Sequence, residues 1–380
     1  MSKKITIIGP AYPLRGGLSS YNELLAIKLQ KQGHQVKIIT FSLQYPNFLF
    51  PGKTQYSNSL PPDNLDIEVS LNSINPINWI LLGRKIKNEK PDLVIFRFWM
   101  PFMGPCLGTL GRIIRRNKHT KIVAITDNII PHEKRFGDRL LTSYFLKSCN
   151  AFLTMSKAVL NDLKSFNISR PAVFNPHPMY ENFGEHINKL EARKKLGLDK
   201  DGGYVLFFGF IRKYKGLDTL LKAFSDRRLK EIKLKLIIAG EYYDSPQEYL
   251  KLIEDLELKD FVILANHYIE DSDVSLYFSA ADLVAQTYKT ATQSGVTQIA
   301  YYYNKPMLVT HVGGLAELVP HQRVGYVTSQ NPKEISDYIF DFYENDRLSE
   351  FSKNIESERN KFTWESLIDN LFKVSGLSKY

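Results

Sequence analysis

The chain has 380 residues, 43% of them hydrophobic and 24% charged. These values are ordinary for a soluble globular protein, and the length exceeds that of one ordinary core, so we expect two domains with a cleft between them. No segment approaches the roughly 18 to 20 unbroken apolar residues of a membrane-spanning helix, and no signal-peptide pattern is present, which favours a cytoplasmic location. Cys106 and Cys149 have no metal-ligand spacing, so we expect reduced, packed thiols.

The net charge of +10 is unevenly distributed. Residues 1–175 carry 24 Lys or Arg against 10 Asp or Glu, whereas residues 176–380 carry 26 against 30. Basic clusters at 84–90 and 112–118 favour an anionic partner such as a membrane surface, with a merely solvated surface as an equal alternative. Nucleic acid is not expected, because no aromatic side chains interleave with these basic runs.

The first half alternates apolar runs with helical stretches. Ile- and Val-rich runs predict strands at 5–8, 36–40, 93–96, 122–125 and 152–154, and helical spacing predicts a helix over 19–32. Strands that alternate with helices indicate an α/β domain with a doubly wound parallel sheet. Ligands of such a sheet lie at the carboxyl ends of its strands.

Several residues follow those predicted strands. Gly16 and Gly17 come between the first strand and the first helix, where glycines let a phosphate approach the backbone, although a structural turn is the alternative. The absence of a G-x-G-x-x-G pattern argues against a dinucleotide dehydrogenase. Arg97 and Trp99 end another strand and form either a wall for a sugar or phosphate ligand or a buried corner.

The fourth predicted strand leads into Asp127 and, five residues later, His132. Both are placed at a strand's carboxyl end, over the expected cleft. A lone histidine is more often a surface or core residue, so a direct role for His132 is the less favoured of two alternatives.

The pattern changes after Phe174, where a run rich in Asn and Pro cannot continue a helix or a central strand. Strands are then predicted at 204–208, 234–239, 261–265, 283–285 and 307–310, again with helices between them. We therefore expect an N-terminal domain over 1–175 and a C-terminal domain over 176–361. The amphipathic segment 362–380 is the closing helix.

Two loops of the second half are suited to an anion. Arg212 and Lys215 follow the strand that ends at Gly209. Thr292-Gln293-Ser294-Gly295 opens a helix after a buried strand, so its backbone N–H groups and helix dipole favour a phosphate. Asp271-Ser272-Asp273 resembles a metal-binding motif, but its place before a short helix favours a capping role, and no metal site is expected.

The stretch 290–319 resembles the donor-site core of retaining GT-B glycosyltransferases, specifically glycosyltransferase family 4. Lys305-Pro306 and the Gly-Gly-x-x-Glu run that ends at Glu317 match that family, and Lys215 falls at the family spacing of a Gly-Arg…Lys-Gly element. Two departures stand out. Ala291 and Ile299 occupy the positions of the family's paired glutamates, and Phe210 occupies that of its arginine.

The resemblance implies the GT-B fold, two Rossmann-like domains that bind the donor in the C-terminal domain and the acceptor in the N-terminal domain. In that fold the closing segment 362–380 packs back on the N-terminal domain. It also implies that Arg212 and Lys215 bind the diphosphate of a nucleotide sugar, that Gly16 and Gly17 face the same phosphates, and that Asp127 or His132 contacts sugar and acceptor. We assign Thr292 and Gln293 to the donor sugar and Gln298 to the ribose. Ser294, Gly295 and Glu317 complete the expected donor site.

The expected function is therefore a retaining, metal-independent hexosyltransferase. Its donor is a nucleotide sugar, and its acceptor is a glycan or lipid-linked hydroxyl used in cell-surface polysaccharide or lipopolysaccharide synthesis. A peripheral position on the inner face of the cell membrane suits the basic N-terminal domain. Two alternatives remain: a degenerate GT-B protein that binds a nucleotide sugar or a partner transferase without turnover, and a GT-B nucleotide-sugar epimerase.

Overall fold

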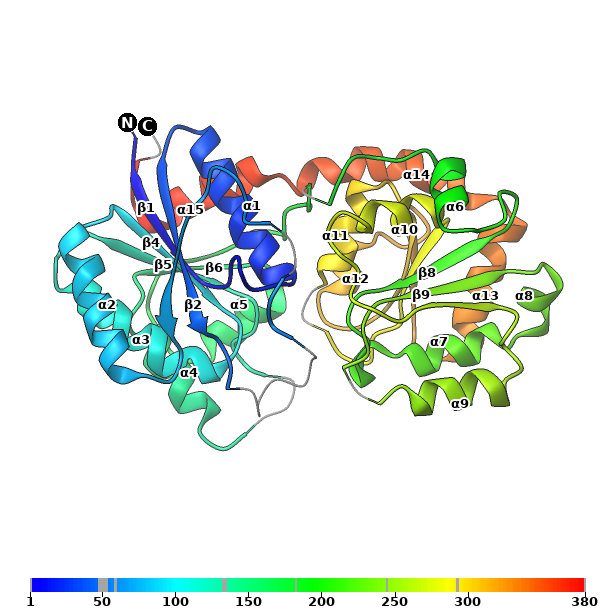
Figure 1. Ribbon diagram of the computed structural model, residues 1–380, viewed down its shortest axis with the longest axis horizontal. Coiled ribbons are helices and arrows are strands. Elements are labelled where there is room, and N and C mark those ends of the chain that lie inside the picture. The colour runs from blue at the N-terminus through cyan, green and yellow to red at the C-terminus, as the bar shows by residue number, and fades with distance from the viewer. Residues whose placement is uncertain are drawn as a thin grey trace. The chain divides into compact units, whose positions relative to one another are not determined.

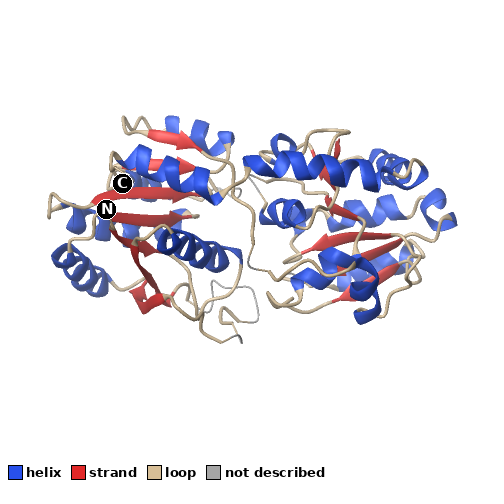
Figure 2. Ribbon diagram, turned by 90° about the horizontal axis from the view of Figure 1, so that it is seen from above, coloured by secondary structure: helices blue, strands red, loops and turns tan. Residues whose placement is uncertain are grey.

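The computed structural model describes residues 2–46, 54–57, 60–131, 135–181, 183–243, 245–291 and 294–378. Within these, the chain divides into two compact units. The N-terminal unit contains Met1–Pro178 and Thr363–Tyr380, and the C-terminal unit contains Met179–Phe362. Each unit is a parallel sheet with helices on both faces (Figures 1 and 2).

The N-terminal unit has seven strands in the order β3-β2-β1-β4-β5-β6-β7, every neighbouring pair parallel. Its elements are β1 (Lys4–Ile8), α1 (Gly17–Lys31), β2 (Gln35–Leu43), β3 (Asp66–Asn72), α2 (Pro76–Glu89), β4 (Leu93–Phe98), η2 (Pro101–Met103), α3 (Gly104–Arg115), β5 (Lys121–Thr126), α4 (Asp138–Leu146), β6 (Ala151–Thr154), α5 (Lys157–Lys164), β7 (Ala172–Phe174) and, from the C-terminus, α15 (Trp364–Ser375). The strand order reverses between β1 and β4, which is where a doubly wound sheet binds its ligands.

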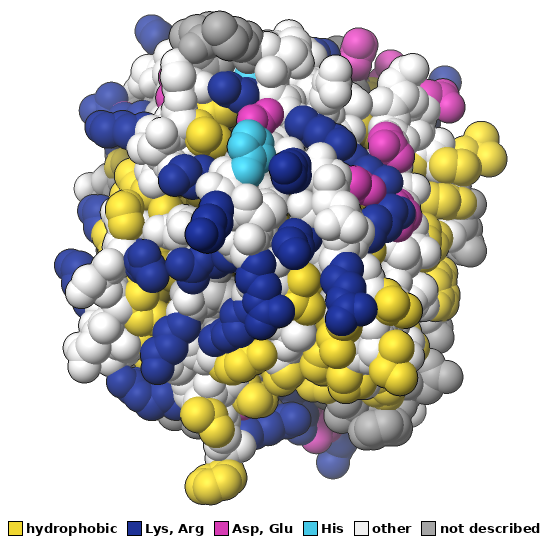
Figure 3. Space-filling view, turned by 90° about the vertical axis from the view of Figure 1, so that its left-hand side faces the viewer, with side chains coloured by type: hydrophobic (Ala, Val, Ile, Leu, Met, Phe, Trp, Pro, Cys, Tyr) yellow, Lys and Arg dark blue, Asp and Glu magenta, His cyan; other side chains and the backbone are white. Residues whose placement is uncertain are grey.

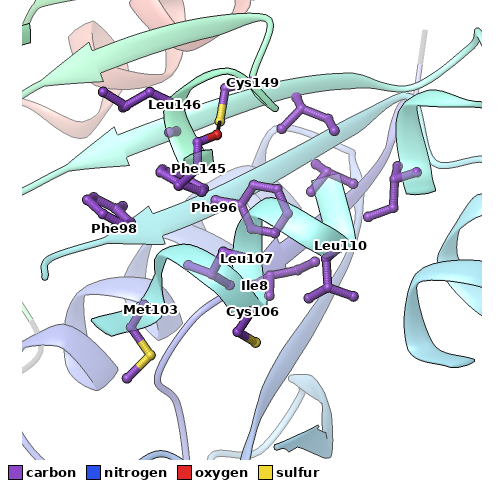
Figure 4. Packing of buried hydrophobic residues seen from close by; sticks show 14 of the residues in the cluster. Ile8, Phe96, Phe98, Met103, Cys106, Leu107, Leu110, Phe145, Leu146 and Cys149 are labelled. Atoms are coloured by element: carbon purple, nitrogen blue, oxygen red, sulfur yellow. Dashed lines mark hydrogen bonds between the residues drawn. The ribbon is translucent and has the colours of Figure 1, made fainter. Parts of the chain in front are cut away.

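The core of this unit lies between the sheet and the helices α2, α3 and α4. Every second side chain of the central strands, such as Ile8 and Phe96, points to this face and meets Leu107, Leu110 and Phe145 (Figure 4). Cys106 and Cys149 belong to the same core and are free thiols, as expected. Burial raises the pKa of Cys149 to about 12, so this thiol is an inert packing residue.

The other face of the sheet is covered by α1 and α15. The C-terminal helix is held there by Trp364, which is fully buried and lies 5.0 Å from the ring of Tyr21. The hydroxyl of Ser366 also donates a hydrogen bond to Asn175, at the end of β7.

The C-terminal unit has six parallel strands in the order β10-β9-β8-β11-β12-β13. Its elements are α6 (Lys189–Lys195), β8 (Tyr204–Phe208), η3 (Lys213–Lys215), α7 (Leu217–Phe224), α8 (Arg227–Glu231), β9 (Lys235–Ala239), α9 (Gln247–Asp255), β10 (Val262–Ala265), α10 (Val274–Ala280), β11 (Leu283–Gln286), α11 (Gly295–Tyr302), β12 (Met307–Thr310), α12 (Leu315–Leu318), β13 (Gly325–Thr328), α13 (Pro332–Glu344), α14 (Arg347–Glu358) and η4 (Arg359–Lys361). Here the strand order reverses between β8 and β11.

The observed architecture confirms the predicted α/β class, with a doubly wound sheet in each half. Three strands that the sequence did not predict, β3, β7 and β13, each lie at the edge of a sheet. None of the helices that the structure describes is long and apolar enough to cross a membrane.

Candidate functional site

The reversal point of the C-terminal sheet brings two loops together, one after β8 and one after β11. Gly216 has φ +68°, and a Cβ built on it would lie 1.9 Å from the carbonyl oxygen of Thr287. The Thr287 hydroxyl in turn donates a 2.9 Å hydrogen bond to the Gly216 carbonyl. A second link runs from the backbone N–H of Lys289 to the carbonyl of Tyr214. Only glycine fits this approach and this φ, so the sequence Lys215-Gly216 fixes one loop against the other.

Lys215 is the buried cation of this junction. Its side chain is only 8% exposed, and its ammonium forms no hydrogen bond or ion pair with any residue that the structure describes. The ammonium lies 5.6 Å from the ring centroid of Tyr288 and beside the backbone of Gly209. Burial, with a smaller contribution from the charge of Arg212, lowers the pKa of Lys215 to about 7.

Arg212 supplies a second cation three residues earlier. Its guanidinium lies 4.1 Å from the ring centroid of Tyr243, which itself packs edge-on against Phe210 at 4.7 Å. This stacking holds a half-buried guanidinium beside the loop that carries Lys215. Two cations within one loop repel each other, which raises the free energy of the charged state of both side chains. An anion bound between them would offset that repulsion.

The helix α11 begins beside these groups. Ser294 is its N-cap, and the Ser294 hydroxyl accepts a 3.2 Å hydrogen bond from the backbone N–H of Val296. That hydroxyl is also 3.2 Å from the phenol oxygen of Tyr288, the residue whose ring faces Lys215. Tyr288 therefore contacts both Lys215 and the N-cap of α11, the end at which the helix dipole is positive. Thr292 and Gln293 lie outside the described residues.

Three buried polar side chains, Gln286 of β11 and Thr297 and Gln298 of α11, form a cluster that the sequence did not predict. The Thr297 hydroxyl donates to Gln286 Oε1 at 3.1 Å. Gln298 has no exposed surface, and neither its amide nitrogen nor its amide oxygen has a hydrogen-bond partner among the described residues. A ribose could reach Gln298 only if neighbouring groups moved.

The other positions that the resemblance singles out in this unit lie in different surroundings. Ile299 is a core residue at 5% exposure, Ala291 is half-buried, and Glu317 is exposed on α12 after the Gly313 turn, whose φ is +49°. Asp273 precedes α10 without forming a side-chain cap hydrogen bond, so the expected capping role is wrong for Asp273. No group of three or more His, Cys, Asp or Glu that could hold a metal occurs in the described parts of the chain.

In the N-terminal unit, the carboxyl ends of β4 and β5 bring Arg97 and Asp127 together. Arg97 Nε and Nη2 donate to the two carboxylate oxygens of Asp127 at 2.6 and 2.5 Å. Arg97 is 2% exposed, and its guanidinium lies 3.9 Å from the ring centroid of Tyr21. Of the two alternatives for Arg97, the buried corner describes it, and an exposed acceptor wall does not.

The same region holds His177, which belongs to the Asn- and Pro-rich run after Phe174. His177 packs edge-on against Tyr21, with ring centroids 4.9 Å apart. Burial, with a smaller effect from Arg97, lowers the pKa of His177 to about 3, so the ring is neutral near pH 7. Two prolines flanking a histidine gave no sign of this core position.

The remaining N-terminal candidates lie around the first and fourth strands. Trp99 is half-buried and donates its indole N–H to the Tyr45 hydroxyl at 2.6 Å. Gly16, with φ +107°, is the N-cap of α1, and Gly17 is exposed at its first position. His132 lies outside the described residues.

Both halves of the chain match known protein families. Residues 188–361 match the family described as Glycosyl transferases group 1, and residues 15–177 match Glycosyltransferase Family 4. An uncharacterized glycosyltransferase of Methanocaldococcus jannaschii is 24% identical over 363 residues, which cover 88% of this chain and 87% of the relative.

Solved structures share the whole fold. Sucrose-phosphate synthase from Thermosynechococcus elongatus superposes with a TM-score of 0.75 at 16% identity, covering 98% of each chain. HepE from Anabaena, solved in complex with UDP, superposes with a TM-score of 0.74 at 16% identity, covering 97% of this chain and 98% of the other. These similarities confirm the predicted fold of two Rossmann-like α/β domains.

Proposed function

Because this chain is a glycosyltransferase of the group 1 type, we propose that it moves a hexose from a nucleotide-diphosphate sugar to a hydroxyl of a glycan or lipid-linked acceptor. The observation that carries the donor assignment is the buried ammonium of Lys215, which has no anionic partner among the described residues. A buried charge without a counter-ion is costly, so its presence favours a ligand that brings negative charge.

The donor diphosphate supplies about two negative charges, and the loop junction offers the groups to neutralise them. We assign the ammonium of Lys215, the guanidinium of Arg212 and the backbone N–H groups of Ser294 and Gly295, which donate to no described residue, to the phosphate oxygens. Free Lys215, with its pKa near 7, takes up a proton when the diphosphate arrives. These groups suffice for leaving-group stabilisation, so we propose that the reaction needs no metal.

We propose that the reaction retains the configuration of the sugar. The acceptor hydroxyl attacks the anomeric carbon from the face that the diphosphate leaves. The bond from that carbon to the phosphate oxygen breaks as the new glycosidic bond forms, and the departing phosphate oxygen takes the hydroxyl proton. Lys215 and Arg212 stabilise the charge that develops on the leaving diphosphate, and no protein nucleophile is required.

Other assignments complete the proposal. Thr292 and Gln293 contact the donor sugar, and Glu317 contacts the donor. Gln298 contacts the ribose after the groups that bury it move. In the N-terminal unit, Asp127 and His132 act on the sugar and acceptor, and Gly16 and Gly17 face phosphate. Arg97 takes a positioning role, since its guanidinium fixes both carboxylate oxygens of Asp127.

The acceptor side is assigned to the basic N-terminal unit. A charge of 24 Lys or Arg against 10 Asp or Glu over residues 1–175 attracts a phosphorylated or membrane-bound acceptor. We therefore propose a role in polysaccharide or lipopolysaccharide synthesis, with the protein peripheral on the inner face of the cell membrane.

One alternative has support of its own. By the resemblance to glycosyltransferase family 4, Ala291 and Ile299 stand where a pair of glutamates is expected, and Ile299 is a packed core residue at 5% exposure. A protein that binds a nucleotide sugar without turnover fits this loss. An epimerase is less favoured, because proton-transfer chemistry needs the carboxylates that are missing.

A panel of nucleotide sugars separates these functions. The purified full chain is incubated with each donor, and release of nucleoside diphosphate is measured with and without extracts of lipid-linked and glycan acceptors. We expect release with one donor, stimulated by an acceptor. Donor binding without release under every condition would favour the non-enzymatic alternative. Failure of every donor and nucleoside diphosphate to bind would overturn the proposal.

A further inference from the structure

The outer surface of α2, α3 and α4 combines exposed apolar side chains with basic side chains. On α2, Ile77 and Leu81 are 69% and 59% exposed, Ile80 is 39% exposed, and Arg84 follows one turn later on the same side. The opposite side of α2 is buried through Leu82 and Ile86. The outward side of a surface helix is normally polar. This helix departs from that rule, because it carries apolar side chains on its outward side as well as on its buried side.

The helix α4 repeats the arrangement. Phe136, just before α4, is fully exposed, and Leu140 and Tyr144 follow at intervals of four residues with exposures of 74% and 38%. Of fifteen exposed large hydrophobic side chains among the described residues, ten belong to the N-terminal unit, so the apolar exposure is concentrated there. Contiguous exposed apolar surface marks an interaction site.

Close packing makes the three helices one surface. A Cβ on Gly83 of α2 would lie 3.1 Å from Ile113 of α3, and one on Gly108 of α3 would lie 2.6 Å from the ring of Tyr144. The guanidinium of Arg112 lies 3.7 Å from that ring centroid, and Arg115 donates to the carbonyl of Lys147. Basic side chains of α3 thus border the exposed apolar side chains of α4.

Positive charge predominates on this surface. The helix α3 contains no Asp or Glu, and α2 and α4 contain one each, Glu89 and Asp138. Figure 3, which faces the side of the N-terminal unit where α2, α3 and α4 are labelled in Figure 1, shows Lys and Arg side chains across its middle with hydrophobic side chains beneath them.

We propose that this surface, the α2–α4 face, docks the protein onto an anionic lipid bilayer, with the aliphatic tips inserted at the headgroup level and the Lys and Arg side chains on lipid phosphates. Membrane-surface helices combine apolar and basic side chains in this way. Protein interfaces instead have cores depleted of charge, and lysine especially. The inference deepens the proposed function by naming how a lipid-linked acceptor is reached, and it rests on that function only for this purpose.

Flotation with lipid vesicles tests the docking surface. The full chain is mixed with vesicles of phosphatidylcholine alone or with added phosphatidylglycerol, at low and high salt. We expect binding to the anionic vesicles, lost at high salt, and little binding to the neutral ones. Equal binding to both kinds of vesicle, or to neither, would overturn the proposal.

Matched variants localise the binding. Arg116 is exposed and directly follows α3. Each basic side chain near an anionic bilayer contributes roughly fivefold to binding, so Arg84→Gln with Arg116→Gln should lower the partition coefficient about thirtyfold. Lys222→Gln with Lys251→Gln, which removes two exposed lysines of the C-terminal unit, should leave it unchanged. Leu81→Ser should weaken binding several-fold, whereas Leu250→Ser, on α9 and 43% exposed, should not. If either control lowered vesicle binding as much as its matched test variant, the assignment of binding to the α2–α4 face would be contradicted.

Two further measurements keep the outcomes separate. Lys215→Ala should bind vesicles like the wild type, so loss of donor binding and loss of docking are independent results. Sedimentation of the wild type and of Leu81→Ser tests whether this face binds a second copy of the protein in place of a bilayer. Concentration-dependent association that Leu81→Ser abolishes, without vesicle binding, would make this face a protein interface and refute the bilayer proposal.

Discussion

The carbonyl oxygen of Thr287 lies so close to Gly216 that a side chain at position 216 would meet it at 1.9 Å. The contact joins the loops after β8 and β11, and so sets where Lys215 stands relative to the start of α11. Any shift at Gly216 therefore moves the two halves of the expected phosphate site apart.

Gly216→Ala should reduce both stability and donor binding. Gly197→Ala is the matched control, because Gly197 has nearly the same φ, +66° against +68°, but nothing within 4 Å of its added Cβ. We expect Gly197→Ala to cost roughly 1 kcal/mol of unfolding free energy, from backbone strain alone, and to leave nucleotide-sugar affinity unchanged. Gly216→Ala should cost more and lower affinity at least tenfold by calorimetry. Similar behaviour of the two variants would show that the Thr287 contact is unimportant.

Lys215 should destabilise the ligand-free protein. Because its folded pKa is lowered to about 7, below that of the unfolded chain, its cost is fully present below pH 7 and disappears as the pH rises toward the unfolded value. Lys215→Met should therefore raise the free energy of unfolding by a few kcal/mol at pH 6 and by much less at pH 9. Urea titrations at the two pH values measure this. A gain in stability of Lys215→Met over the wild type that is the same at both pH values would refute the lowered pKa of a buried cation.

The same lowered pKa couples donor binding to proton uptake. Below pH 7 the free lysine already carries its proton, but above pH 7 the diphosphate must draw one from solution. The association constant should then fall by up to about tenfold per pH unit between pH 7 and 9. A nucleotide sugar suits the measurement, since its diphosphate does not titrate in this range. Calorimetry at pH 8 in two buffers of different ionisation enthalpy should report uptake of up to one proton by the wild type and none by Lys215→Met.

Arg97 and Asp127 should be coupled in stability. Each is buried, and removal of one deprives the other of both charge-assisted hydrogen bonds of the pair, at a cost of about 3 to 5 kcal/mol. Arg97→Met and Asp127→Leu should each destabilise by that order, whereas the double variant should recover a large part of the loss. Single variants that cost under about 0.5 kcal/mol, or fully additive costs, would contradict the buried pair.

The alternation of apolar runs and helices was enough to predict the α/β fold, because central parallel strands are buried on both faces. The three strands that escaped prediction are edge strands. In β3, for example, only Leu71 is fully buried, so the segment shows no continuous apolar run. An edge strand is defined by its neighbour in the sheet, which lies far away in the sequence.

The site shows the same limit. Lys215 and the start of α11 could be predicted, since a cation or a helix start is a local feature. Thr287 and Tyr288 gave no local signal, although they connect the two loops. Arg97 and Asp127 were each identified but assigned separate roles. Their pairing across 30 residues depends on β4 and β5 being neighbours in the sheet.

The most direct test of the account is the affinity of Lys215→Ala for the nucleoside diphosphate of the preferred donor, measured by calorimetry beside wild type and Lys222→Ala, an exposed lysine on α7. Loss of a charged contact to phosphate should cost about 1.5 to 3 kcal/mol, a tenfold to more than hundredfold weaker complex, with Lys222→Ala unchanged. A Lys215→Ala protein that folds and binds within threefold of wild type would contradict the diphosphate assignment.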